Sequence, residues 1–365
     1  MDEHDPSKAV VEVTRLRMRI LMRAYNGREG GIHMERRRLL EGALAAAGLY
    51  VSQAALAATS AQASSFEMER DASQALARTS RKLQKIAIDH MGGASVTESQ
   101  QRALACWRDS IAVKVNSKVG PRLHRAANIE ARAAGLVAMF FADQGDHRNA
   151  QSWYQRADAV TRENNTKGWL LACQAWGYLF NGDGTTAVGL AGDALALYDW
   201  ANAPQRAFAY NQMARGHAIN GDFERALESL AYADEEFQKA PKEARETDPS
   251  LIGFSKWQHA AYAADVYSMA GETERARVAR AVAMTAPKLN GMNRLIAEVG
   301  EAQCLVADGE PEAAVQRVQR TLTGLSTEDQ GTAVVVGKAR LFVHSIPTAF
   351  DSKPVRELKE YLAAA

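Results

Sequence analysis

The feature that most constrains the fold is one residue spacing that occurs five times between residues 131 and 322. In each copy an alanine is followed seven positions later by a glycine, and five positions after that by a second alanine. Small side chains are needed where two helices touch most closely, and glycine is favoured where a chain leaves one helix for the next. The spacing therefore predicts a series of antiparallel helix pairs. The five triplets are Ala138/Gly145/Ala150, Ala175/Gly182/Ala187, Ala214/Gly221/Ala226, Ala264/Gly271/Ala276 and Ala302/Gly309/Ala314.

The same spacing resembles that of the tetratricopeptide repeat (TPR). We therefore expect an all-α protein, a right-handed α-solenoid of TPR helical hairpins, with about five repeats over residues 129–362. Successive glycines lie 37, 39, 50 and 38 residues apart, and the longest interval contains the polar segment Lys239–Ser250 with two prolines, which predicts an inserted surface loop. Only Thr332–Val336 has the β-branched composition of a strand.

Charge and cysteine content exclude several classes of protein. The chain has 44 basic and 43 acidic residues, so no net field attracts nucleic acid or an anionic membrane. We expect no membrane span. The three cysteines, Cys106, Cys173 and Cys304, have no metal-ligand spacing. We expect them to be buried thiols that pack as small hydrophobic residues, which favours a reducing, cytoplasmic location.

The N-terminal third is less regular, and we divide it into a helical arm (1–33), an alanine-rich linker helix (34–66) and a divergent helical cap (67–128). The cap should be helical from 66 to 115, with a break at 91–96, where two glycines occur. Residues 34–63 admit three interpretations: a linker helix that caps the repeats, a twin-arginine export signal, or a degenerate helix-turn-helix. Arg36-Arg37 and the Ala61-x-Ala63 end favour export, whereas Gln53–Ala57 is typical of the start of a second DNA-binding helix.

Several segments resemble actinobacterial repressor-type (XRE) helix-turn-helix regulators that carry a TPR sensory half. These are Glu130–Tyr154, Gly216–Asp222, Asp248–Phe254, Val355–Leu362 and the arginine-rich linker Met34–Leu40. The resemblance implies a sensory, regulator-like module for residues 34–362. The 33 residues before the linker are too few for the family's DNA-binding domain, so we expect no intrinsic sequence-specific nucleic-acid binding.

Motifs for catalysis are missing from the sequence. It contains no His-Glu-x-x-His, Gly-x-Ser-x-Gly, phosphate-loop or Cys-x-x-Cys pattern. We therefore expect no catalytic residues, no metal site and no cofactor.

The inner helix of each repeat should present one face to a concave groove, through the residues ten, nine, six and three positions before the glycine. Carboxamides there can pair with a peptide backbone, a guanidinium can hold a carboxylate, and aromatic rings supply desolvated contact. The packing positions of the third inner helix belong to other residues, so we expect Asn211 and Arg215 to be dispensable for stability. The predicted groove residues are Asn211, Gln212, Arg215, Phe208, Trp169, Trp176, Tyr262, Asp265 and Gln258.

These observations favour a non-catalytic TPR sensory or adaptor protein in signalling that binds a peptide or a protein partner, with homodimerisation left open. Two alternatives remain: an exported TPR scaffold from which residues 34–63 are removed, and a transcriptional regulator with a degenerate helix-turn-helix.

Overall fold

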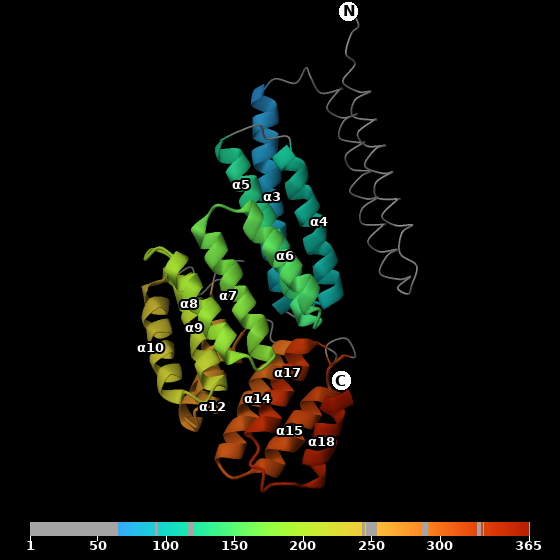
Figure 1. Ribbon diagram of the computed structural model, residues 1–365, viewed down its shortest axis with the longest axis vertical. Coiled ribbons are helices and arrows are strands. Elements are labelled where there is room, and N and C mark those ends of the chain that lie inside the picture. Colours follow the sequence, from blue (N-terminus) through green and yellow to red (C-terminus); the bar gives the residue numbers. More distant parts are fainter. Residues whose placement is uncertain are drawn as a thin grey trace, which may run out of the picture. The chain divides into compact units, whose positions relative to one another are not determined.

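The computed structural model describes residues 65–91, 94–115, 120–242, 245, 254–286, 291–326, 330 and 332–364. The chain divides into two compact units, Met1–Met68 and Glu69–Ala365, and the described helices belong to the second, apart from the first residues of α3. Every regular element in this described part is an α-helix, which confirms the all-α class (Figure 1). The arm (1–33), almost all of the linker helix (34–66) and most of the predicted loop at 239–250 lie outside the described residues.

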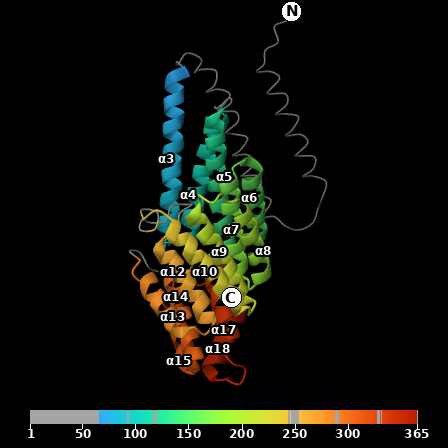
Figure 2. The ribbon, with the colours of Figure 1, turned by 90° about the vertical axis from the view of Figure 1, so that its left-hand side faces the viewer.

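The helices follow one another with short connections, and Figures 1 and 2 show α3 and α4 at one end of the second unit and α15 and α18 at the other. Their bounds are α3 (Ser65–Met91), α4 (Val96–Val115), α5 (Pro121–Asp143), α6 (His147–Val160), α7 (Asn164–Phe180), α8 (Gly184–Leu197), α9 (Ala203–Ile219), α10 (Phe223–Lys239), α12 (Lys256–Met269), α13 (Thr273–Ala283), α14 (Gly291–Ala307), α15 (Pro311–Thr323), α17 (Ala333–Ser345) and α18 (Lys353–Ala364).

Consecutive helices pack in pairs. α5 packs on α6, α7 on α8, α9 on α10, α12 on α13, α14 on α15 and α17 on α18. The first helices of successive pairs also contact one another in chain order, from α5 through α7, α9, α12 and α14 to α17. We call these six the inner helices.

Five interhelix turns share one backbone geometry. Each contains a glycine with φ between 74° and 84°, in the left-handed region that other residues rarely adopt. Between α9 and α10, the Gly221 N–H donates to the Ala218 carbonyl at 3.1 Å and the Asp222 N–H donates to the His217 carbonyl at 2.9 Å. The same two bonds recur in the other four turns and form the Schellman motif, which satisfies the last carbonyls of a helix. The five glycines are the predicted ones: Gly145, Gly182, Gly221, Gly271 and Gly309.

An aspartate follows the glycine in three of these turns and caps the next helix. The Asp146, Asp183 and Asp222 carboxylates accept the backbone N–H three residues ahead, at 3.1, 2.9 and 3.2 Å. Hydrogen bonds from the Thr186 hydroxyl and backbone hold the pKa of the Asp183 carboxyl below its ordinary value. Glycine and aspartate together thus end one helix and begin its partner.

The ten alanines of the five triplets are all buried, with exposed fractions of 7% or less. The predicted positions of close helix contact are therefore confirmed. The break predicted at 91–96 is also confirmed, because α3 ends at Met91 and α4 begins at Val96.

One boundary of the predicted organisation differs from the structure, and the structure adds a sixth helix pair. The boundary between cap and repeats at 128/129 falls inside α5, which begins at Pro121, because the alanine pattern becomes visible only after the helix has started. Thr332–Val336 is not a strand: the Thr332 hydroxyl caps α17, which forms a sixth pair with α18. This pair keeps a buried alanine, Ala339, but Ile346 stands seven positions later where the other pairs have glycine.

α17 contacts more than its neighbour in the chain. It packs on α14, and also on α7 and α5, which precede it by more than 150 residues. Its Val334 shares a buried apolar cluster with Phe180 of α7 and Ile296 of α14. A Cβ built on Gly337 would overlap the Phe180 carbonyl oxygen, so only glycine allows this approach. The inner helices therefore enclose a shared interior, and α17 closes it.

Candidate functional site

Side chains from three inner helices meet around Arg215 of α9. Its guanidinium lies over three aromatic rings, with its central carbon 5.1 Å from the centroid of Trp176, 5.3 Å from Phe180 and 4.9 Å from Tyr262. Trp176 and Phe180 come from α7, one helical turn apart, and Tyr262 comes from α12. A guanidinium that has lost its water gains cation–π stabilisation from each ring. Trp176 and Tyr262, which the sequence pattern predicts, and Phe180, which it does not, thus surround one cation.

Arg215, Asp265 and Lys338 form an ion-pair cluster in the interior. The Arg215 Nε donates to Asp265 Oδ2 at 3.0 Å, and the Lys338 ammonium of α17 donates to Asp265 Oδ1. The three side chains are 1–4% exposed. Burial alone would raise the pKa of the Asp265 carboxyl, but Lys338 and Arg215 outweigh it and hold that pKa below its ordinary value.

The cluster carries more positive than negative charge, because two cations share one carboxylate. Burial lowers the pKa of the Lys338 ammonium, Asp265 counteracts this, and Arg215 adds to the lowering. Removing a charge from water costs several kcal/mol per ion, and only close pairing offsets it. Lys338 is therefore the least well compensated charge of the three.

Two carboxamides on α9 border the cluster and are incompletely bonded. The Gln212 Oε1 accepts from Arg215 Nη1 at 3.3 Å, and the Asn211 Nδ2 donates to the Ala207 carbonyl at 2.8 Å. Asn211 Nδ2 also lies 3.1 Å from Nδ1 of His259, whose other ring nitrogen lies 2.6 Å from an oxygen of Asp234. Among the described residues, Asn211 Oδ1 and Gln212 Nε2 find no hydrogen-bond partner, although both side chains are fully buried.

The structure gives each predicted groove residue a place. Asn211, Gln212, Arg215, Tyr262 and Asp265 do lie on the inner faces of their helices. The expectation that they line a solvent-accessible groove is wrong: none is more than 8% exposed, because each packs against side chains of neighbouring helices, as Asn211 does against His259 and Arg215 against Asp265. The expectation that Arg215 is dispensable for stability is wrong for the same reason, since it pairs with Asp265 in the core.

The remaining predicted residues have other places. Phe208 is half-buried at the border of the cluster, with its ring centroid 6.3 Å from that of Tyr262. Trp169 packs instead against Gly135 of α5, in the core near the N-terminal helices. Gln258 forms a capping box with Ser255 at the start of α12, so its side chain serves the helix end.

Sequence analysis missed Lys338, Phe180 and His259. Lys338 follows the apolar run Val334–Gly337, and a lone lysine in an apolar stretch of helix was the available signal.

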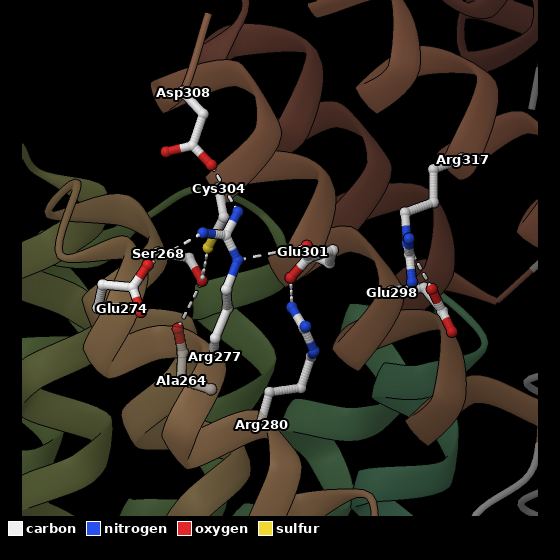
Figure 3. A network of polar contacts seen from close by, with 10 residues as sticks. All are labelled: Ala264, Ser268, Glu274, Arg277, Arg280, Glu298, Glu301, Cys304, Asp308 and Arg317. Atoms are coloured by element: carbon white, nitrogen blue, oxygen red, sulfur yellow. Dashed lines mark hydrogen bonds and ion pairs between the residues drawn. The ribbon is translucent and has the colours of Figure 1, made fainter. Parts of the chain in front are cut away.

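A second polar network lies on α12–α15 and is shown in Figure 3. Arg277 of α13 reaches Glu301 at 3.5 Å and Asp308 at 2.5 Å, both from the next helix pair, and Arg280 pairs with the same Glu301. The arginine side chains are 31% and 21% exposed. These charges keep part of their hydration, so the network joins two helix pairs at a modest energy per contact. This network is therefore partly hydrated, whereas the Arg215, Asp265 and Lys338 cluster is fully buried.

The described residues contain no group of three or more His, Cys, Asp or Glu side chains able to hold a metal ion. Cys106, Cys173 and Cys304 are free and buried, as expected, and burial raises the pKa of the Cys106 and Cys173 thiols. Within the same part of the chain, no helix is long and apolar enough to cross a membrane.

No protein-family model matches this chain, and no curated protein matches it. The likeness to TPR regulators therefore depends on the residues quoted above.

Proposed function

We propose that this chain is a non-catalytic, regulator-like adaptor built as a right-handed TPR solenoid, and that its inner helices bind an extended or helical segment of a peptide or protein. The observation that carries the proposal is the pair of unsatisfied carboxamide atoms, Asn211 Oδ1 and Gln212 Nε2, beside a charged and aromatic cluster. A buried polar atom without a partner costs about 1–3 kcal/mol. A peptide backbone offers both the donor and the acceptor that these atoms lack.

The surroundings of the two carboxamides suit such a ligand. Asp265 and Arg215 supply one charge of each sign, and Trp176, Phe180 and Tyr262 supply flat apolar surface. Aromatic residues and arginine are the residue types that most often dominate binding energy at protein interfaces. An arrangement built only for packing would place apolar side chains at these positions.

The test is selection of displayed peptides on the immobilised full chain, followed by measurement of their affinity for variants. Gln212→Met conserves the volume of the side chain and removes its amide. Gln238→Met makes the same change on the exposed outer face of α10, where Gln238 accepts from Arg245 at 2.8 Å. We expect selected peptides to bind the Gln238 variant as they bind the parent, and to lose at least about tenfold on the Gln212 variant, which corresponds to one lost hydrogen bond. Equal affinity for all three proteins would exclude the inner helices as the site.

We also propose a cytoplasmic location, supported by the three free buried thiols. Mass spectrometry of the native N-terminus tests it. A mature protein that starts near Ser64 would instead support the exported alternative.

A further inference from the structure

α17 reaches the charged side of the proposed site, where its Lys338 pairs with Asp265. Three residues on one face of this helix, at positions i, i+3 and i+4, make its contacts with the inner surface. Val334 packs with Phe180 and Ile296, Gly337 meets the Phe180 carbonyl, and Lys338 pairs with Asp265. A short helical pattern, an apolar β-branched residue followed by glycine and lysine, is thus recognised by the rest of the chain.

The ion pair of Lys338 with Asp265 is the charged contact of this pattern, and a cation from another chain could take the place of Lys338. If α17 leaves, Asp265 keeps Arg215 as its partner at 3.0 Å, so the interior retains one cation and one anion. When α17 is present, the enclosed charges sum to one excess positive charge on the side chains Arg215, Lys338 and Asp265. The inner surface therefore does not need α17 for charge neutrality, whereas Lys338 needs Asp265.

The glycine contact sets a steric requirement. Because any Cβ at position 337 would overlap the Phe180 carbonyl oxygen, a larger residue there drives α17 away from α7. The larger contact of α17 with α14 and α18 is made by Val335, Ala339 and Phe342, which share a buried apolar cluster with residues of those helices, although Val334 also meets Ile296 of α14. Separation from α7 is thus possible without loss of the neighbouring helix pair.

We propose that α17 is an internal occupant of the binding site, and that the ligand is a helical peptide that replaces it and presents a lysine or arginine to Asp265. This inference rests on the proposed function and adds the chemistry of the ligand. A small residue would face the Phe180 carbonyl one position before the cation, and an apolar residue would lie one turn earlier.

The probe is a fluorescent synthetic peptide with the sequence of residues 332–346, used with the full chain. A control peptide carries the change Lys338→Met. The proteins are the parent, Gly337→Ala, and Gly337→Ala combined with Asp265→Asn. Arg277→Met, in the network of Figure 3, is the control variant. It removes a charged contact elsewhere in the protein and leaves the contacts of α17 unchanged.

We expect Gly337→Ala to bind the probe at least about tenfold more tightly than the parent or Arg277→Met, because the internal competitor has been expelled. The Lys338→Met peptide, and the protein that also carries Asp265→Asn, should each lose about tenfold or more. Hydrogen exchange in α17 of the parent should rise when the probe is present in excess. If Gly337→Ala does not fold, Lys338→Met in the full chain weakens the same contact without a steric clash, and the same order is expected.

Three results would overturn the inference: equal binding by parent and opened variants, equal binding of both peptides, or binding that is independent of Asp265. If displayed peptides still depend on Gln212 while the α17 probe fails, the ligand differs from α17 and the proposed function stands. If neither class of peptide depends on the inner helices, both proposals are wrong.

Discussion

Neutralising Asp265 should destabilise the protein far more than neutralising Lys338, although the two side chains form the same ion pair. Asp265→Asn leaves Arg215 and Lys338 buried without an anion, and breaking a buried pair in this way typically costs about 3–5 kcal/mol. The lysine can relieve its share by losing a proton, which at pH 7 costs about 4.6 kcal/mol for a group with an ordinary pKa near 10.4. The cost of deprotonation is therefore the upper limit on the destabilisation that Lys338 alone can cause in Asp265→Asn.

Lys338→Met behaves differently because Asp265 keeps its contact with Arg215 at 3.0 Å. The lost charge-assisted hydrogen bond, about 1.5–3 kcal/mol, is offset by the desolvation penalty of the ammonium, several kcal/mol. We therefore expect the free energy of unfolding to change by less than about 1.5 kcal/mol in either direction. In the double variant, the cost of Asp265→Asn should fall, because one of the two unpaired cations is gone.

Urea unfolding followed by far-ultraviolet circular dichroism measures these differences, with an unchanged denaturant slope as the sign that the native fold is kept. A rise in pH should shrink the penalty of Asp265→Asn by up to about 1.4 kcal/mol per unit, since Lys338 then sheds its proton more readily. Arg277→Met, in the partly exposed network, is the control and should show no such pH dependence. If Asp265→Asn costs no more than Lys338→Met, the carboxylate does not hold two cations in the native protein.

Four further outcomes are expected. Ala214→Leu should overpack the α9–α10 pair and lower stability by about 1–3 kcal/mol, and an unchanged melting temperature would contradict the repeat register. Gly221→Ala, at φ 77°, should lower stability by about 1 kcal/mol, whereas Gly189→Ala, inside α8 with open space around it, should raise it by about 0.5–1 kcal/mol. Burial raises the pKa of the Tyr262 hydroxyl, so its contribution to stability is complete below about pH 10, where the unfolded tyrosine is also neutral, and is lost as the pH rises further. In Tyr262→Phe, the free energy of unfolding should therefore fall less steeply above pH 10, by about 1.4 kcal/mol per pH unit. Duplex DNA should bind only weakly and without sequence preference, and a specific complex at physiological salt would instead support the degenerate helix-turn-helix interpretation of residues 34–63.

The local order of the chain could be predicted from the sequence because each element is specified by nearby residues. A glycine that adopts positive φ marks a turn, and a small residue seven positions before it marks a helix contact. Both signals lie within a stretch of sequence shorter than one helix pair. The sixth pair escaped notice since Ile346 replaces the turn glycine there. Its helix ends in extended backbone instead of a left-handed turn.

The composition of the site was predictable, but its exposure was not. Arg215, Asp265 and Tyr262 occupy the face that the repeat register assigns to them. Whether that face meets water depends on the curvature of the helix array. This curvature is the sum of small angles between successive helix pairs. No local pattern records the contact between Phe180 and Gly337, because it joins segments 157 residues apart. Lys338 therefore had no visible partner in the sequence.

The contact of α17 with α7 has a consequence for how the protein is made. In an array held only by neighbouring repeats, each pair folds as soon as the next one is present. Here one partner of Asp265 belongs to residues 333–345, which leave the ribosome after the other inner helices. Until then the nascent chain holds a folded array whose charged interior is still hydrated, and such late intermediates expose surface that chaperones bind. Closure of that interior therefore waits for α17, and a ribosome that stalls before Gly337 releases a chain in which Asp265 lacks Lys338 as a partner.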